Sequence, residues 1–148
     1  MNIQYGSLDQ NNKLIWNFRD IGHTMRQISE GRGSQKRILI LLLETAGMTQ
    51  KELTARLGVQ PGSASEVLNK LEQAGMILRT PSETDRRTMD IRLTPDGEAA
   101  AKEASAKRAE RHEQMFAVLS AEEKADLIAL LEKINAHWTR LYRHTDGE

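Results

Sequence analysis

Apolar residues recur with helical spacing near both ends of the chain. Near the N-terminus they are Leu14, Phe18, Ile21, Met25 and Ile28, at steps of four, three, four and three residues. Near the C-terminus the same steps join Leu127, Leu131, Ile134, Trp138 and Leu141. Such spacing puts each set on one face of a helix, as in the paired helices of a coiled coil. We therefore predict one helix from about Lys13 to Ser29 and a last helix that follows Ser120.

A second helix is predicted from about Gln35 to Ala46. It contains the apolar run Ile38–Leu43, for which periodicity alone leaves a buried strand open as the alternative. Gly47 is expected to end this helix, because glycine tolerates the left-handed conformation that closes many helices.

Two short helices are expected next. Thr49 and Glu52 form a capping box, so a helix should begin there, and Gly58 should stop it after about two turns. Pro61 is suited to the first turn of a further helix, which Gly75 ends.

After this point the period changes to two. The segments 76–80 and 89–93 are predicted as short strands, and the loop 81–88 between them is polar and carries two adjacent arginines. Thr94, Pro95 and Asp96 then suit the start of a long alanine-rich helix that extends to about Leu119. A second capping box, Ser120 with Glu123, begins the last helix.

The predicted order is helix, helix, three-residue turn, helix, strand, loop and strand. This is the layout of a winged helix-turn-helix, in which one helix enters the DNA major groove and a basic hairpin lies beside it. The fold class is therefore predicted as mainly α, with a small β-hairpin wing and long terminal helices. We expect a helical dimerisation region, residues 1–34 and 95–148, and a DNA-binding lobe, residues 35–94, within a single folding unit.

Residues 35–97 resemble the DNA-binding core of the MarR family, the multiple-antibiotic-resistance regulators. The similarity is carried by segments 48–59 and 65–77, by Asp85 and Arg87 in the wing, and by segment 93–97. The order of the flanking helices also fits, so the resemblance spans nearly the whole chain. It implies a homodimer with interlocked terminal helices, and control of transcription, usually repression, tuned by a small ligand or by oxidation.

The composition of the chain limits the regulatory mechanisms that this resemblance allows. The chain has 148 residues, no cysteine, and 21 basic against 21 acidic residues. Residues 31–80 carry seven basic and four acidic groups, a balance of +3, whereas residues 98–148 carry eight and ten, a balance of −2. The absence of cysteine excludes thiol-based sensing of peroxide and is typical of a cytoplasmic protein. We expect no cofactor and no metal site.

The candidate DNA-binding residues lie on or next to the helix that begins at Pro61, and in the wing that follows it. Arg86 and Arg87 are expected to contact DNA, with Asp85 orienting Arg87; a solvated turn is the alternative. Arg79 is expected either to contact a phosphate or only to contribute to solubility. Glu66 would repel phosphate unless it accepts a hydrogen bond from a cytosine amino group. The full set is Gln60, Ser63, Ser65, Glu66, Asn69, Lys70, Arg79, Arg86 and Arg87.

The two terminal apolar stripes are expected to hold the dimer together, although packing within one subunit is the alternative. The candidate dimerisation residues are Phe18, Ile21, Leu127, Leu131, Ile134 and Trp138.

No catalytic motif is found, and the four histidines form no ligand pair, so no enzymatic activity is expected. No segment is apolar over the ~20 residues that a membrane span needs. The expected partners are double-stranded DNA, a second copy of the chain and a small apolar or anionic aromatic ligand. The competing hypothesis is a winged-helix scaffold that binds proteins and not DNA.

Overall fold

The computed structural model describes residues 3–28 and 33–143. The chain divides into two compact units, Met1–Ser105 and Ala106–Glu148, and each is considered by itself below. The elements are α1 (Ile3–Gly6), α2 (Gln10–Ile28), α3 (Gln35–Thr45), β1 (Met48–Thr49), α4 (Gln50–Leu57), α5 (Pro61–Gln73), β2 (Ile77–Pro81), β3 (Met89–Leu93), α6 (Pro95–Met115) and α7 (Ala121–Tyr142).

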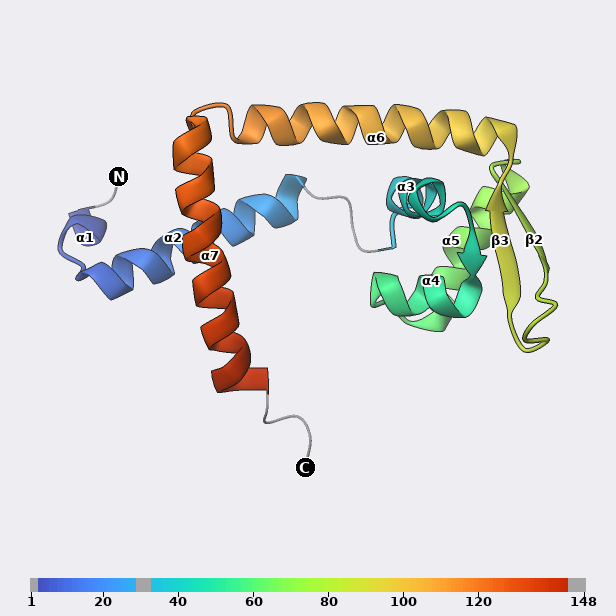
Figure 1. Ribbon diagram of the computed structural model, residues 1–148, viewed down its shortest axis with the longest axis horizontal. Helices are drawn as coiled ribbons and strands as arrows, with labels where there is room; N and C mark the ends of the chain where they lie inside the picture. The colour runs from blue at the N-terminus through green and yellow to red at the C-terminus, as the bar shows by residue number, and fades with distance from the viewer. Residues whose placement is uncertain (1–2, 29–32, 144–148) are drawn as a thin grey trace. The chain divides into compact units, whose positions relative to one another are not determined.

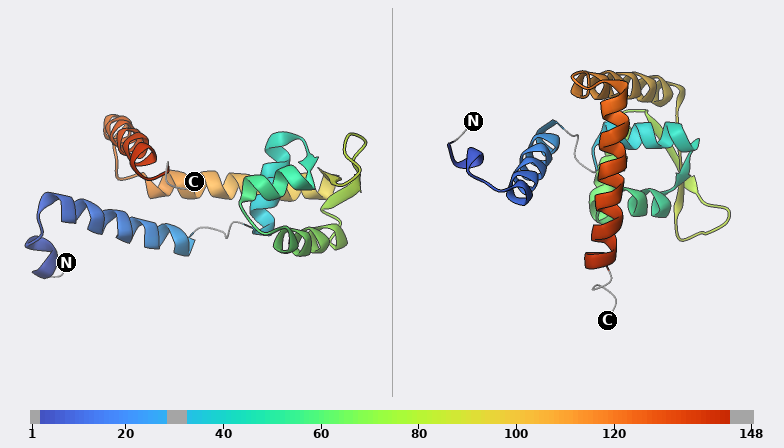
Figure 2. Two further views of the ribbon diagram at one scale, coloured as in Figure 1. Left: turned by 90° about the horizontal axis from the view of Figure 1, so that it is seen from below. Right: turned by 60° about the vertical axis from the view of Figure 1, so that its left-hand side comes forward.

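The winged helix-turn-helix is confirmed as the architecture of the central segment. Helices α3, α4 and α5 lie on one side of an antiparallel three-stranded sheet of order β1-β3-β2 (Figure 1). Both views of Figure 2 show the loop of the β2–β3 hairpin projecting past these helices. The fold thus presents α5 and the hairpin loop as neighbouring surface features.

The apolar run after position 37 forms a helix, which settles the alternative left open by periodicity. Ile38, Ile40 and Leu42 of α3 are almost completely buried. Ile38 and Leu42 belong to a core cluster that includes residues of α4, α5 and the sheet. The other large side chains of this core that are buried to the same extent are Leu53, Leu68, Leu71, Ile77 and Ile91.

Both predicted capping boxes are present. The Thr49 hydroxyl accepts from the Glu52 amide at the start of α4, and Ser120 accepts from the Glu123 amide at the start of α7. In each, the glutamate carboxylate accepts from the backbone N–H of the cap residue, so two otherwise unpaired amides are satisfied.

Some boundaries differ from the sequence prediction. Helix α3 ends in a left-handed residue at Ala46, with φ 55°, one position before Gly47. Gly47 follows with a positive φ of 105°, as its predicted role requires, and a Cβ there would also lie 3.0 Å from the carbonyl oxygen of Ile91. Helix α6 ends at Met115 and not near Leu119, because the following amides bond three residues back and form turns. The end of the first predicted helix at Ser29 lies outside the described residues.

Two elements were not predicted. Helix α1 has four residues, and β1 has two, which pair with β3 in the register Met48 to Ile91 and Thr49 to Asp90. Strand β1 joins the start of α4 directly to the wing.

The start of α6 is locked against the end of α5 and the start of β2. Thr94 donates its hydroxyl to the carbonyl of Gly75 and its amide to the carbonyl of Met76, and it accepts from the Gly97 amide at 3.0 Å. Gly97 is buried, and a Cβ there would lie 1.8 Å from the Met76 carbonyl oxygen. The approach is so close that only glycine fits.

Candidate nucleic-acid interface

Helix α5 presents a polar outer face. Its inner face is Ala64, Leu68 and Leu71, all buried, and this fixes which residues point outward. Pro61 occupies the first helical turn, as predicted, and Gln60 at the N-cap makes no side-chain capping bond. The predicted site residues on and next to α5 that are exposed are Gln60, Ser63, Glu66, Asn69 and Lys70.

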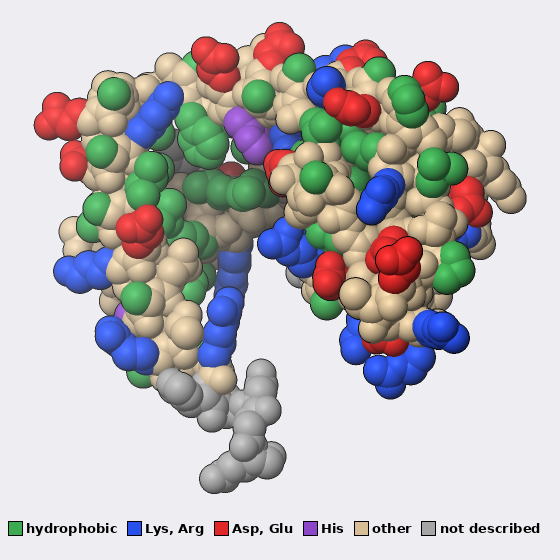
Figure 3. Space-filling view, turned by 45° about the vertical axis from the view of Figure 1, so that its right-hand side comes forward, with side chains coloured by type: hydrophobic (Ala, Val, Ile, Leu, Met, Phe, Trp, Pro, Cys, Tyr) green, Lys and Arg blue, Asp and Glu red, His purple; other side chains and the backbone are tan. Residues whose placement is uncertain are grey.

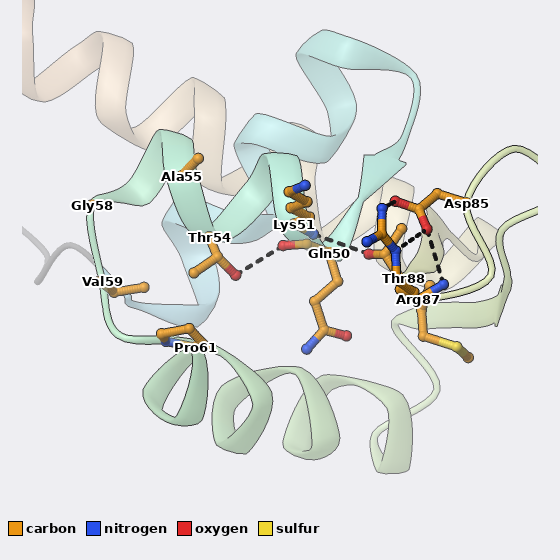
Figure 4. A pocket seen from close by; sticks show the side chains of 11 residues that line it. Gln50, Lys51, Thr54, Ala55, Gly58, Val59, Pro61, Asp85, Arg87 and Thr88 are labelled. Atoms are coloured by element: carbon orange, nitrogen blue, oxygen red, sulfur yellow. Dashed lines mark hydrogen bonds and ion pairs between the residues drawn. The ribbon is translucent and has the colours of Figure 1, made fainter.

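Ser65 is half-buried and differs from its exposed neighbours. The side-chain amide of Gln50, on α4, donates to the Ser65 hydroxyl at 2.9 Å. Figure 4 shows Gln50 pointing from α4 toward α5. Ser65 is thus held by α4, the helix that precedes α5, and Gln50 is a site residue that the sequence did not indicate.

Glu66 and Lys70 lie one turn apart, and the Lys70 Nζ is 3.7 Å from a Glu66 carboxylate oxygen. Both side chains are well exposed, so this pair adds little to stability. The pair matters for the surface charge of α5, because the lysine partly balances the negative charge that Glu66 would present to phosphate.

Arg79, on β2, lies against α5. Its Nε donates to Glu72 at 3.1 Å, and its Nη2 donates to Glu72 at 3.2 Å and to the side-chain oxygen of Asn69. The hydrogen bond from Arg79 lowers the pKa of the Glu72 carboxyl below its ordinary value. Only 16% of the Arg79 side chain is exposed, against 42% for Glu72. Arg79 therefore enters the site chiefly as a partner of two α5 side chains.

The wing loop is organised by Asp85. Its carboxylate accepts from the Arg87 backbone amide and from the Arg87 Nε, both at 3.1 Å. The side-chain hydrogen bond from Arg87 is the main reason why the pKa of Asp85 lies below its ordinary value, with the nearby charge of Lys51 a smaller cause. The Arg87 side chain remains 88% exposed, and Arg86 is also exposed. This geometry fits the orienting role expected of Asp85.

Figure 3 shows basic side chains gathered at the tip of the lobe where this loop projects. The loop is tied to α4 as well, because the Lys51 backbone amide donates to the Thr88 hydroxyl at 3.2 Å. The two arginines predicted for the wing are thus presented to solvent from an anchored loop.

A groove of about 800 Å³ opens between α4, the turn that leads into Pro61 at the start of α5, and the wing loop. Lys51 and Arg87 contribute positive charge to it, and Thr54 and Thr88 contribute hydroxyl groups (Figure 4). Lys51, Thr54 and Thr88 were not singled out from the sequence, since their place in the groove depends on the β1–β3 pairing. The complete lining is Gln50, Lys51, Thr54, Ala55, Gly58, Val59, Pro61, Asp85, Arg87, Thr88 and Met89.

The terminal helices carry exposed apolar faces. None of the described residues of α2 or α7 is buried within the single chain. Ile21 is 56% exposed and Trp138 is 40% exposed, although both belong to the predicted apolar stripes. The remaining candidates for the dimer, Phe18, Leu127, Leu131 and Ile134, are half-buried or exposed.

Within residues 3–28 and 33–143, no three histidine, aspartate or glutamate side chains lie together as metal ligands would. No helix in this part of the chain combines the length and the apolar character needed to cross a membrane.

Comparison with known proteins gives consistent results. A family model described as MarR family matches residues 34–89. The uncharacterized HTH-type transcriptional regulator YwhA of Bacillus subtilis (strain 168) is 33% identical over 97 residues, which are 66% of this chain and 70% of that protein. The homoprotocatechuate degradative operon repressor of Escherichia coli is 31% identical over 102 residues, which are 69% of each chain.

Solved structures show the same fold. A mutant MarR from E. coli, crystallised in complex with operator DNA, superimposes with a TM-score of 0.67 at 25% identity. The match covers 86% of this chain and 99% of that one.

Proposed function

The chain belongs to the MarR family, and from this premise we propose that it is a sequence-specific DNA-binding regulator of transcription, acting as a repressor. The observation that carries the proposal is the exposed polar face of α5, together with a wing loop that is anchored to α4 and presents two arginines to solvent. A polar recognition helix and two exposed arginines, held by an anchored loop, meet the two requirements of DNA binding, which are base-edge contacts and phosphate contacts.

Roles are assigned on this basis. Ser63, Ser65, Glu66 and Asn69 face the major groove, where base edges are read. Arg86 and Arg87 contact the phosphates or the adjacent minor groove, and Gln60 and Lys70 contact the backbone at the ends of α5. Lys51 is added to this set, because it lies in the same groove as Arg87.

The acting species is a homodimer. The exposed apolar faces of α2 and α7 support this, because monomeric soluble proteins seldom expose large contiguous apolar patches. A two-fold dimer places two recognition helices one turn of DNA apart, so the operator is an imperfect palindrome with half-sites about 10 bp apart. A small apolar or anionic aromatic ligand that favours a different spacing of the two lobes would release the DNA.

No reaction is proposed for the chain, since the described residues of the site offer contacts to DNA and no set of catalytic groups. We propose the cytoplasm as its place of action, because the curated relatives are regulators of transcription.

The test is selection of DNA from random duplexes by the full-length protein, followed by mobility-shift assays on the selected sequence. We expect a palindromic sequence that is bound in preference to unrelated DNA. If no sequence is enriched while the protein is folded and dimeric, the regulator assignment fails and the winged-helix scaffold becomes the better hypothesis.

A further inference from the structure

Asn69 is an exposed side chain on the outer face of α5 that is also held from another element. Its side-chain oxygen accepts a hydrogen bond from Arg79 of β2, and Arg79 is held in turn by two hydrogen bonds to Glu72. Glu72 lies three residues after Asn69, one helical turn further along α5. The three side chains form a small cluster, which we call the Asn69 clamp.

The clamp determines which atom of Asn69 faces outward. A guanidinium group has donors only, so it must bind the oxygen of the asparagine amide and not the nitrogen. The oxygen is therefore directed back toward β2. The amide nitrogen, which carries two hydrogen-bond donors, is left on the solvent side.

This orientation changes the base that Asn69 can read. An asparagine that reads adenine in the major groove uses both amide atoms, because its nitrogen donates to N7 and its oxygen accepts from the N6 amino group. The oxygen that accepts from Arg79 is directed toward β2 and away from the position in which it would accept from an N6 amino group. Guanine presents two acceptors, N7 and O6, and is matched by donors alone.

We propose that Arg79 and Glu72 are positioning residues that fix Asn69 as a hydrogen-bond donor, so that Asn69 selects guanine over adenine at the base pair it contacts. The proposal rests on the function proposed above and specifies one part of its DNA code. Arg79 itself acts through Asn69 and contacts no base.

The experiment uses the full-length protein and its selected operator. Asn69→Ala first locates the base pair, since it should remove discrimination at one position of each half-site. All four base pairs are then compared at that position for the wild type and for Arg79→Met, which keeps the length of the side chain and removes its donors. We expect the wild type to prefer guanine, and Arg79→Met to shift the ratio of guanine to adenine toward adenine on the order of ten-fold.

Three further variants separate positioning from a merely structural role. Arg79→Lys keeps a charged group with donors only and should retain most of the preference for guanine. Glu72→Gln removes the charge that holds Arg79, so it should shift the base preference in the same direction as Arg79→Met, but less. Because Glu72 is exposed, this variant should fold, and it keeps the test decisive if Arg79→Met does not. In an Asn69→Ala background, Arg79→Met should leave the ratio unchanged.

The outcomes are distinct. If the wild type selects no DNA, the proposed function fails as a whole. If it selects DNA but prefers adenine at the Asn69 position, or if Asn69→Ala flattens no position, the clamp proposal is overturned and the proposed function stands. An Arg79→Met variant that weakens all sequences equally would identify Arg79 as a phosphate contact and would also overturn the proposal.

Discussion

Replacing Gly97 by alanine should destabilise the protein, although alanine is the better helix former. The added Cβ would lie 1.8 Å from the Met76 carbonyl oxygen, where ordinary van der Waals contact begins at about 3.4 Å. The difference, 3.4 − 1.8, is 1.6 Å, and the neighbouring atoms are backbone atoms that cannot rotate away. Helix α6 must therefore move away from the start of β2.

The size of the effect follows from three contributions. Overpacking of this kind costs about 1–3 kcal/mol. The movement also weakens the hydrogen bond from the Thr94 amide to the Met76 carbonyl, worth about 1 kcal/mol. Alanine returns up to about 1 kcal/mol of helix propensity. We expect a net loss of about 1–3 kcal/mol in the free energy of unfolding.

Gly62 supplies the matched control. It lies in the first turn of α5, and a Cβ built there meets nothing within 4 Å. Gly62→Ala should therefore raise the free energy of unfolding by about 0.4–1 kcal/mol, since alanine restricts the unfolded chain. The same substitution should thus have opposite signs at the two positions.

The assay is urea unfolding followed by circular dichroism, with all variants at one protein concentration, because the stability of a dimer depends on concentration. A Gly97→Ala variant that is as stable as the wild type, next to a Gly62→Ala variant that behaves as expected, would refute the close packing of α6 on Met76.

Three further predictions concern the wing and the dimer. Arg87→Ala should weaken binding to all DNA sequences alike and reduce the salt dependence of affinity by about one phosphate contact; fluorescence anisotropy of labelled operator at several salt concentrations measures both, and unchanged operator affinity would exclude the wing assignment. The ratio of the operator affinities of wild type and Asp85→Asn should stay constant between pH 5 and 8. The pKa of Asp85 is lowered from 3.8, so its carboxylate is charged and holds Arg87 throughout that range. It releases Arg87 only as the pH falls through the lowered value. Leu131→Asp should dissociate or unfold the dimer in light scattering at micromolar concentration, whereas Lys133→Asp on another face of α7 should not, and a monomeric wild type would rule out the proposed interface.

Much of the fold could be predicted from the chain alone, because its signals are local. The capping boxes at Thr49 and Ser120 and the proline at position 61 placed the starts of three helices. The alternation from Met89 to Leu93 placed β3. Strand β1 escaped prediction because two residues carry no period, and its pairing with β3 is set by tertiary packing.

Most residues of the site could be predicted from the sequence, but the contacts between them could not. Arg79 could be selected as a basic residue near α5, but its hydrogen bonds to Asn69 and Glu72 join residues ten and seven positions apart across a turn. Lys51 carried no signal at all, since its role depends on the wing loop that lies beside it only after folding. The family resemblance supplied the layout of the site, and the structure supplied the partners of each side chain.

The short β1–β3 pairing has a consequence for how the lobe unfolds. Met48 pairs with Ile91, 91 − 48 = 43 residues later in the chain, so α4, α5 and β2 all lie inside one closed loop. Closing such a loop lowers the entropy of the chain, and only the contacts of the complete core offset this cost. The elements inside the loop have no free end from which they could fray. The backbone amides of the recognition helix and the wing should therefore exchange with solvent together, in one cooperative opening. A destabilising substitution in the core anywhere between Met48 and Ile91 should therefore lower the fraction of molecules in which α5 and the wing are both folded.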